Sequence, residues 1–149
     1  FVKIPITNTK GESSEKLVNR LSNDGINLNV TAILTTEQVN NVVRNISDKS
    51  NTIISVFAGR IADTGRNPIP YIKESLNIIK GSSNAELLWA SSRELLNIFQ
   101  AEECGCQIIT VTNDLLKKLK MVGKDLGDLS LDTVKMFYND AVSLGYKIL

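Results

Sequence analysis

The segment TIISVFAG, residues 52–59, decides the fold class of this chain. It is apolar at nearly every position, contains β-branched residues and ends at a glycine. A strand with apolar residues throughout is buried on both faces, as in a parallel sheet that is covered by helices. The segment therefore predicts an α/β protein with a parallel sheet.

Four similar runs flank this segment, with helical patterns between them. The runs are FVKIPIT (1–7), INLNVTAIL (26–34), AELLWAS (85–91) and QIITVT (107–112). In one helical pattern, apolar residues recur at i, i+3, i+4 and i+7 after the N-cap signal Thr35-Thr36-Glu37. The expected order is β-α-β-α-β-α-β-α-β-α-α, which indicates either a doubly wound sheet or a (β/α)8 barrel.

Two further features bear on this choice. Five strands are too few to close a (β/α)8 barrel. The chain also has no G-x-G-x-x-G and no G-K-[ST] sequence. These glycine-rich loops bind phosphates in many open α/β sheets, so their absence argues against a nucleotide-binding protein of that kind.

Composition excludes several classes of protein. The chain has 149 residues, enough for one domain with a real core, and 42% of them are hydrophobic and 22% charged. The formal net charge is +1, and charges of both signs are scattered along the chain. We therefore expect no nucleic-acid partner and no membrane association, and no apolar run approaches the ~20 residues of a membrane-spanning helix.

The histidine and cysteine content limits the chemistry. The absence of histidine excludes Ser-His-Asp and Cys-His catalysis and leaves carboxylates, lysine, tyrosine or water for acid–base work. Cys104 and Cys106 form a C-x-C pair, but a zinc site would need two more ligands. We expect these two cysteines to be buried or half-buried free thiols, and we expect no metal.

Polar residues interrupt the predicted strands, and the first of them is Lys3. An ordinary lysine there would extend its amine to water at the edge of the sheet. Alternatively, desolvation inside a barrel can lower the pKa of an amine by up to ~3–5 units. An uncharged amine attacks a ketone and forms a Schiff base, whose iminium withdraws electrons from the neighbouring C–C bond.

The second and third strands carry polar residues on a single face. Asn29 and Thr31 alternate with Val30 and therefore point the same way. They are either a satisfied hydrogen-bonding pair, or an amide that holds a substrate hydroxyl beside a hydroxyl that holds a water. Ser55 and Phe57 share one face of the third strand in the same manner.

Two arginines follow the third and fourth strands. Arg60 comes directly after Gly59, and its forked donors would suit an anion, although a surface salt bridge is the alternative. Ser91 and Arg93 lie at the next strand-to-helix junction, where a serine is usually a helix N-cap and the helix N-terminus is a ready anion site. Arg60 and Arg93 on adjacent strand ends predict a phosphate clamp.

Together these segments resemble one known family. VKIP (2–5), NVTAIL (29–34), SVFAGRIADTG (55–65), WASSR (89–93) and IITVTNDLLKKL (108–119) are similar to the transaldolase family, which includes the small transaldolases and the fructose-6-phosphate aldolases. The resemblance covers essentially the whole chain in order and spacing. It implies a (β/α)8 TIM-barrel and a class I (Schiff-base) aldol mechanism with sugar-phosphate substrates and no cofactor or metal. It further implies a cytoplasmic homo-oligomer of the pentose phosphate pathway.

The resemblance also implies roles for individual residues. Lys3 matches the Schiff-base lysine, Thr31 the residue that holds the catalytic water and Asn29 a substrate-binding residue. Ser55 and Phe57 match residues of the substrate pocket. The phosphate-binding set of the family is matched by Arg60, Ser91 and Arg93. Transaldolases tend to have Phe where fructose-6-phosphate aldolases have a proton-donating Tyr, so Phe57 favours transfer of a dihydroxyacetone unit over its release.

In this family VKIP is the fourth strand of the barrel, so we expect residues 1–149 to form the C-terminal part of a single barrel domain, strands 4–8 with their helices. The first three strands would carry an aspartate, an asparagine and a glutamate that work with Lys3. Asp63 is expected in a loop that does not match the position of the family's acid. The activity of these residues alone is left open, and an inactive phosphate-binding module is the alternative. An open sheet edge also predicts self-association of the isolated chain.

Overall fold

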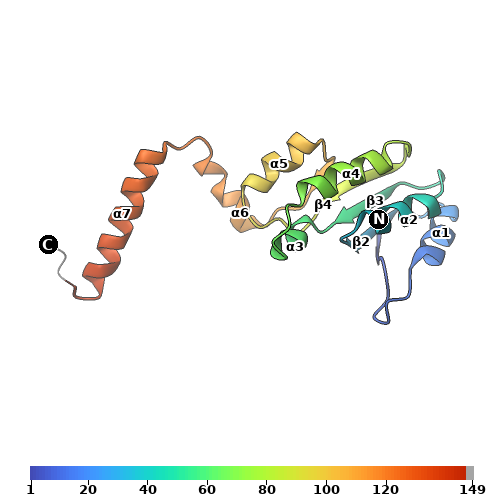
Figure 1. Ribbon diagram of the computed structural model, residues 1–149, viewed down its shortest axis with the longest axis horizontal. Helices are drawn as coiled ribbons and strands as arrows, with labels where there is room; N and C mark the ends of the chain where they lie inside the picture. Colours follow the sequence, from blue (N-terminus) through green and yellow to red (C-terminus); the bar gives the residue numbers. More distant parts are fainter. Residues whose placement is uncertain (147–149) are drawn as a thin grey trace. The chain divides into compact units, whose positions relative to one another are not determined.

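The computed structural model describes residues 1–146, and its sheet consists of parallel strands only (Figure 1). The strands are β1 (Val2–Pro5), β2 (Leu28–Ile33), β3 (Thr52–Val56), β4 (Ala85–Trp89) and β5 (Ile108–Ile109). They lie in the order β1-β2-β3-β4-β5, so each pairs with its neighbours in sequence. The five predicted strands and the α/β class are confirmed, although β5 covers only two residues of the QIITVT run.

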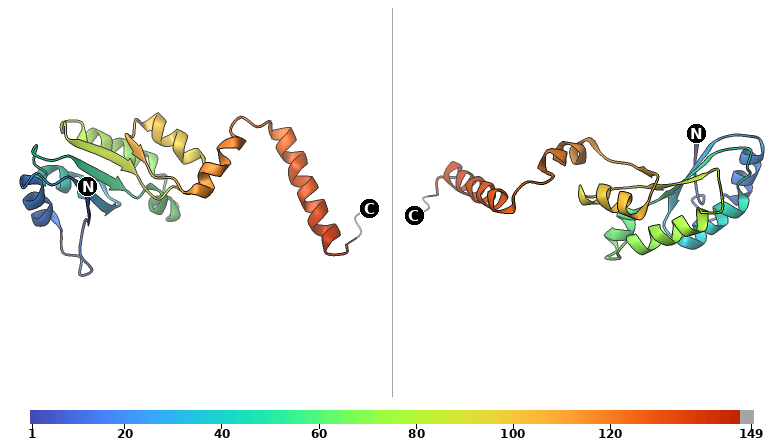
Figure 2. Two further views of the ribbon diagram at one scale, coloured as in Figure 1. Left: turned by 180° about the vertical axis from the view of Figure 1, so that it is seen from behind. Right: turned by 90° about the horizontal axis from the view of Figure 1, so that it is seen from above.

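The helices of this part of the chain lie on one face of the sheet. They are α1 (Glu15–Asn23), α2 (Thr36–Asn45), α3 (Ala58–Asp63), α4 (Ile69–Ile79) and α5 (Leu96–Cys104), and α1–α2, α2–α4 and α4–α5 pack as neighbours. A strand order that runs in one direction with right-handed crossovers puts every helix on the same side. Figure 2 shows the opposite face without helices. A doubly wound sheet has helices on both faces, so this arrangement is that of a segment of a TIM-barrel-like fold.

The core lies between the sheet and the helix layer. Trp89 and Leu28 are fully buried, and the alternate strand residues Val30 and Ile54 join them in this layer. From α1, α2 and α4 come the buried side chains Val18, Val39, Val42, Ile72 and Ile79. The apolar spacing of the helices therefore predicts correctly which side faces the sheet.

The start of α2 shows how local sequence fixes an element. The Thr35 hydroxyl accepts a hydrogen bond from the Gln38 amide, and the Gln38 side chain accepts one from the Thr35 amide. This reciprocal capping box satisfies two donors that a helix leaves free at its first turn. It directs the chain out of β2 and back across the sheet.

Residues 117–146 belong to a second compact unit. It contains a 3-10 helix, η1 (Lys118–Met121), and the 18-residue helix α7 (Leu126–Ser143), and it follows α6 (Asn113–Lys117). The Asp125 carboxylate caps α7 by accepting hydrogen bonds from the Gly127 and Asp128 amides. Within residues 1–146, no helix is long and apolar enough to cross a membrane.

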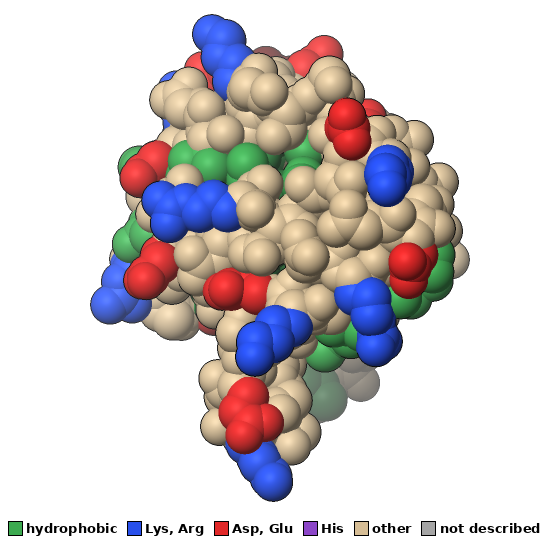
Figure 3. Space-filling model, turned by 90° about the vertical axis from the view of Figure 1, so that its right-hand side faces the viewer, with side chains coloured by type: hydrophobic (Ala, Val, Ile, Leu, Met, Phe, Trp, Pro, Cys, Tyr) green, Lys and Arg blue, Asp and Glu red, His purple; other side chains and the backbone are tan. Residues whose placement is uncertain are grey.

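Charged side chains of both signs are mixed on one face of the molecule. On the face that Figure 3 presents, lysine and arginine side chains alternate with aspartate and glutamate side chains. No extended field of one sign covers this face. The distribution agrees with the formal net charge of +1 and differs from the basic face of a nucleic-acid-binding protein.

Candidate active site

A cavity of about 240 Å³ lies against the helix-free face of the sheet, near the carboxyl ends of the strands. Six of the eight predicted site residues line it, and they come from β1, β2, β3 and the segments that follow β3 and β4. The complete lining consists of Lys3, Asn29, Thr31, Ser55, Phe57, Leu88, Ala90, Ser91 and Thr110. Residues that lie up to 107 positions apart in sequence, Lys3 and Thr110, therefore share one hollow.

Lys3 lies on the edge strand β1, opposite Asn29 of β2. Its side chain is exposed, whereas the neighbouring Ile4 is buried on the helix side. The alternation of β1 therefore turns the amine away from the core and toward the cavity. Lys3 is placed where a substrate could reach it from solvent.

Thr31 is a buried residue with an unused hydroxyl. Its side chain is 8% exposed, and among the described residues its Oγ1 has no hydrogen-bond partner. An unpaired buried hydroxyl costs roughly 1–3 kcal/mol, so it calls for a reason. Because Thr31 lines the cavity, a water or a substrate group in the cavity would satisfy it.

A bulge in β2 determines where Thr31 points. The register of β2 against β3 shifts between Val30 and Ile33, and Ala32 within this bulge has a φ of 62°. Left-handed backbone is unfavourable for alanine, and such outliers cluster at functional sites. Within the described part of the chain, the one other non-glycine residue with a positive φ is Ser91 at 66°, which lines the same cavity.

Asn29 and Ser55 are joined across the two central strands. The Ser55 hydroxyl donates a hydrogen bond of 2.7 Å to the Asn29 Oδ1. This contact uses the Asn29 Oδ1 as an acceptor, and the NH₂ group of the same amide is a donor. The alternative of a mutually bonded Asn29–Thr31 pair is not what the structure shows, because Asn29 uses Ser55.

A second hollow of about 230 Å³ adjoins the first and contains the predicted arginine of the fourth strand end. Its lining is Ser91, Ser92, Arg93, Thr110, Val111 and Thr112, so it shares Ser91 and Thr110 with the first cavity. The Arg93 guanidinium is paired with Asp63, through Nε–Oδ1 at 3.1 Å and Nη2–Oδ2 at 2.5 Å. Its hydrogen bond to this carboxylate raises the pKa of Arg93 above the usual value.

Arg60 has different surroundings from Arg93. It belongs to α3, its guanidinium carbon is 6.0 Å from the centroid of the Phe57 ring, and it lines neither hollow. A cation at this distance interacts favourably with the ring face. The role of Arg60 in phosphate binding therefore stays a prediction, and Phe57 has a contact that sequence reasoning did not foresee.

Two sequence expectations about local structure at this edge were wrong. Ser91 is not a helix N-cap, because α5 begins at Leu96 and its N-cap is Leu95. Asp63 is not in a loop, because it is the last residue of the short helix α3, which the sequence pattern did not predict. A six-residue helix provides too little apolar periodicity to stand out in sequence.

Gly59 lets α3 lie directly against the segment that contains Ser91. A Cβ atom placed on Gly59 would come within 1.6 Å of the Ser91 carbonyl oxygen. Only glycine fits at this position, so the Gly59 that follows the third strand has a packing role. Asn97 fixes the same segment from the other side, because its Oδ1 accepts hydrogen bonds from the amides of Arg93 and Glu94.

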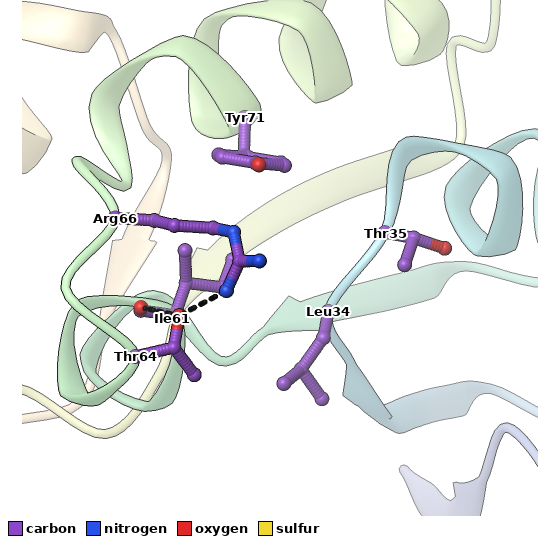
Figure 4. A pocket seen from close by; sticks show the side chains of 6 residues that line it. All are labelled: Leu34, Thr35, Ile61, Thr64, Arg66 and Tyr71. Atoms are coloured by element: carbon purple, nitrogen blue, oxygen red, sulfur yellow. Dashed lines mark hydrogen bonds between the residues drawn. The ribbon is translucent and has the colours of Figure 1, made fainter.

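A larger cavity, of about 300 Å³, lies elsewhere in the fold. Figure 4 shows its lining, which is Leu34, Thr35, Ile61, Thr64, Arg66 and Tyr71. The Arg66 guanidinium lies across this cavity and donates a hydrogen bond of 2.8 Å to the Thr64 hydroxyl. The lining of this cavity includes no lysine and none of the predicted site residues, so the candidate site is the smaller cavity at Lys3.

The two cysteines lie outside the cavity region, on either side of the turn between α5 and β5. Both are half-buried free thiols, as the sequence predicted. Burial raises the pKa of Cys106 to about 11, and it also raises the pKa of Cys104. A thiol with a raised pKa is a poor nucleophile at neutral pH.

The comparisons with known proteins decide the family. The family model described as "Transaldolase/Fructose-6-phosphate aldolase" matches residues 1–148. The chain belongs to this family. It is 33% identical over 120 residues to a "Probable transaldolase" of Caldicellulosiruptor saccharolyticus, an alignment that covers 79% of this chain and 52% of the relative. It is 31% identical over 141 residues to a "Probable transaldolase" of Clostridium acetobutylicum, covering 94% of this chain and 61% of the relative.

These relatives place the site within a longer fold. The chain spans about half the length of curated transaldolase relatives that it matches. The transaldolase resemblance found in the sequence is thereby confirmed at the level of the family. Membership and the parallel sheet agree on a TIM-barrel-like architecture for this segment.

Sequence reasoning missed several residues at the site. Leu88 and Ala90 line the cavity, and their alternation with Trp89 could have placed them on that face. Thr110 follows the short strand β5, and no break in the QIITVT run indicates that the strand ends at Ile109. The pairing of Asp63 with Arg93 spans 30 positions, and no spacing rule indicates such a contact.

Proposed function

We propose that the protein is a transaldolase that transfers a dihydroxyacetone unit between sugar phosphates through a Schiff base on Lys3. The observation that carries this proposal is the shared cavity of Lys3, Asn29, Thr31, Ser55 and Ser91, with Arg93 in the adjoining hollow. An amine and an anion-binding arginine beside one hollow suit a substrate with a carbonyl near one end and a phosphate at the other. Family membership supports the same activity.

In the proposed reaction the uncharged Lys3 amine attacks the C2 carbonyl of a ketose phosphate. The carbinolamine loses water and becomes an iminium. The C3–C4 bond then breaks, its electron pair moves into the enamine, and an aldose phosphate leaves as the C4 hydroxyl loses its proton. The enamine attacks the aldehyde of a second aldose phosphate, whose oxygen takes up a proton and becomes the new C4 hydroxyl. Water then hydrolyses the new iminium to release the product ketose and the free amine.

This chemistry sets a requirement on the surroundings of the amine. An amine in water is almost wholly protonated at neutral pH and is then no nucleophile. Lys3 is exposed on the edge strand of this chain. The proposal therefore requires that further polypeptide covers the β1 edge in the working enzyme and removes water from the cavity.

Thr31 and Asn29 serve the proposed reaction at the carbonyl end. The unpaired Thr31 hydroxyl would hold the water that leaves when the iminium forms and that returns in hydrolysis. The Asn29 amide, oriented by Ser55, would donate to a substrate hydroxyl. Arg93 and Ser91 would bind the phosphate, with Arg60 as a third member of the set.

A second candidate is a fructose-6-phosphate aldolase, which would release dihydroxyacetone instead of passing it on. Phe57, which lines the cavity, has no hydroxyl to donate a proton, and this favours transfer. An assay with fructose 6-phosphate separates the two functions. Release of free dihydroxyacetone without an acceptor supports the aldolase, whereas turnover that depends on an added aldose phosphate supports the transaldolase.

Borohydride trapping tests the proposal directly. The full-length protein is incubated with fructose 6-phosphate and sodium borohydride, which reduces the iminium to a stable secondary amine. We expect a mass increase on the peptide that contains Lys3, and no increase on peptides that contain the exposed Lys49 or in the Lys3→Arg variant. A folded wild-type protein without an adduct at Lys3 rules out the Schiff-base mechanism.

The same experiment addresses a third possibility, an inactive module that keeps the phosphate site. Thermal stabilisation by phosphate without any adduct at Lys3 would support that module. An adduct at Lys3 would instead support an enzyme, for which we propose a place in the cytoplasmic pentose phosphate pathway and a homo-oligomeric assembly.

A further inference from the structure

Asp63 holds the side chain of Arg93 in a two-point ion pair. Asp63 ends α3, and Arg93 lies in the segment that follows β4. The carboxylate accepts from Nε at 3.1 Å and from Nη2 at 2.5 Å, so both of its oxygens are engaged. A two-point contact fixes the plane of the guanidinium as well as its position.

The backbone around Arg93 is fixed by other contacts. The Arg93 amide donates to the Asn97 Oδ1 at 2.8 Å, and the Ser92 hydroxyl donates to the Thr110 carbonyl at 2.8 Å. Gly59 packs against the Ser91 carbonyl. Among the described residues, Asp63 is therefore the one side chain that is bonded to the guanidinium itself.

From this arrangement we infer that Asp63 is a positioning residue that orients Arg93 for an anion of phosphate-monoester chemistry. The inference rests on the proposed function, since it assigns the hollow at Arg93 to the substrate phosphate. A guanidinium has five N–H groups. The pair with Asp63 uses one on Nε and one on Nη2, which leaves three for the anion beside Ser91 and Ser92.

Two opposite effects of Asp63 must be weighed. Its negative charge repels a bound phosphate, and its two contacts keep the arginine in place. The side chains of Arg93 and Asp63 are 47% and 52% exposed, so water and salt screen the repulsion. Orientation is not screened, and a free arginine has a large rotamer entropy to lose on binding. Positioning therefore prevails, and removal of Asp63 weakens phosphate binding.

The test measures the dissociation constant of inorganic phosphate for the full-length protein by titration calorimetry. Relative to the wild type, we expect Asp63→Ala to bind about 3- to 10-fold more weakly, because the guanidinium loses both contacts. Asp63→Asn keeps one acceptor, so its phosphate affinity should lie between those of the wild type and Asp63→Ala. Asp63→Glu keeps the carboxylate and should bind phosphate almost as tightly as the wild type. The matched control is Asp24→Asn, an exposed carboxylate at the end of α1, which leaves phosphate affinity unchanged.

The direction of the change is decisive. Tighter phosphate binding by Asp63→Ala and Asp63→Asn means that charge repulsion prevails, and it overturns the inference. Unchanged binding, an equal loss in Asp24→Asn, or no phosphate binding by the wild type also overturns it. Borohydride trapping at Lys3 is a separate measurement. An adduct at Lys3 with unchanged phosphate affinity in the Asp63 variants supports the Schiff-base proposal and overturns this inference, and weaker phosphate binding without an adduct does the opposite.

Steady-state kinetics of Asp63→Ala distinguish a positioning role of Asp63 from a merely structural one. With an active enzyme, Asp63→Ala should raise KM for fructose 6-phosphate with little change in kcat. It should leave kcat/KM for unphosphorylated fructose unchanged, because that substrate makes no use of Arg93. An equal loss with both substrates would indicate a general disturbance of the site and would count against positioning.

Discussion

Thr31 and Thr52 share one unusual property on opposite faces of the sheet. Both are buried, at 8% and 1% exposure, and among the described residues neither hydroxyl has a hydrogen-bond partner. Thr31 lines the cavity, whereas Thr52 lies on the same face of β3 as Ile54 and Val56 and faces the core. Thr52 is therefore a control for Thr31, because it has the same unpaired hydroxyl but lies away from the cavity.

We expect Thr31→Val and Thr52→Val to leave the free energy of unfolding unchanged or to raise it by up to about 2 kcal/mol, because each removes an unpaired buried hydroxyl. Only Thr31→Val should lower kcat, by about 10- to 100-fold, because in the proposed reaction the Thr31 hydroxyl positions the reacting water. Chemical denaturation and a transaldolase assay on the full-length protein measure the two effects. A loss of activity in Thr52→Val as well, or full activity in Thr31→Val, would contradict the assigned role.

Gly59 supports a second prediction at the scale of a single residue. We expect Gly59→Ala to lower the free energy of unfolding by about 3 kcal/mol or more, because the added methyl group meets the backbone oxygen of Ser91, which cannot rotate away. Gly81→Ala is the control, since Gly81 has an ordinary φ and open space around its Cβ position. Comparable stability of the two variants in urea titrations would show that the contact at Ser91 relaxes easily.

At the scale of elements, the sequence predicts regular structure better than contacts between elements. The strands and the start of α2 at Thr35 follow from local composition and capping, which act over a few residues. Period-two alternation correctly puts Asn29 and Thr31 on one face, and Ser55 and Phe57 on one face. The helix α3 and the pairing of Asp63 with Arg93 depend on tertiary packing, because Gly59 must first let α3 approach the segment after β4. No pattern within either segment contains that information.

The turn from α5 to β5 gives a prediction about thiol chemistry. Alkylation proceeds through the thiolate, and a pKa of about 11 leaves roughly one Cys106 thiolate in 300 at pH 8.5. We expect iodoacetamide to modify Cys104 well before Cys106, and the Cys106 rate to rise about 10-fold per pH unit until the pH approaches that pKa. Peptide mass spectrometry follows both sites.

A control in denaturant separates pKa from sequence context. In 8 M urea the burial that raises the pKa of both thiols is gone, so Cys104 and Cys106 should react at similar rates. Faster native labelling of Cys106 than of Cys104 would mean that the thiol of Cys106 is not buried as the structure has it.

On the scale of the whole molecule, one face of the sheet is covered by helices and the other face is not. The uncovered face presents Ile53 and the residues of the cavity at Lys3, which include Leu88. The sheet is also open, so β1 and β5 each have one unpaired side. Val2 on the β1 edge is 48% exposed. Unpaired edges and exposed apolar residues favour association with other strands.

We therefore expect the isolated 149-residue chain to associate at micromolar concentration, and light scattering after size-exclusion chromatography measures its mass. If the β1 edge carries the association, Val2→Lys should shift the chain toward monomer, because a charge on an edge strand opposes pairing with another strand. Leu131→Lys on α7 is the matched control, since Leu131 has a similar exposure of 52% but lies on a helix outside the sheet. A monomeric wild-type chain would show that the open edge is tolerated in water, and an effect of Leu131→Lys alone would move the contact to α7.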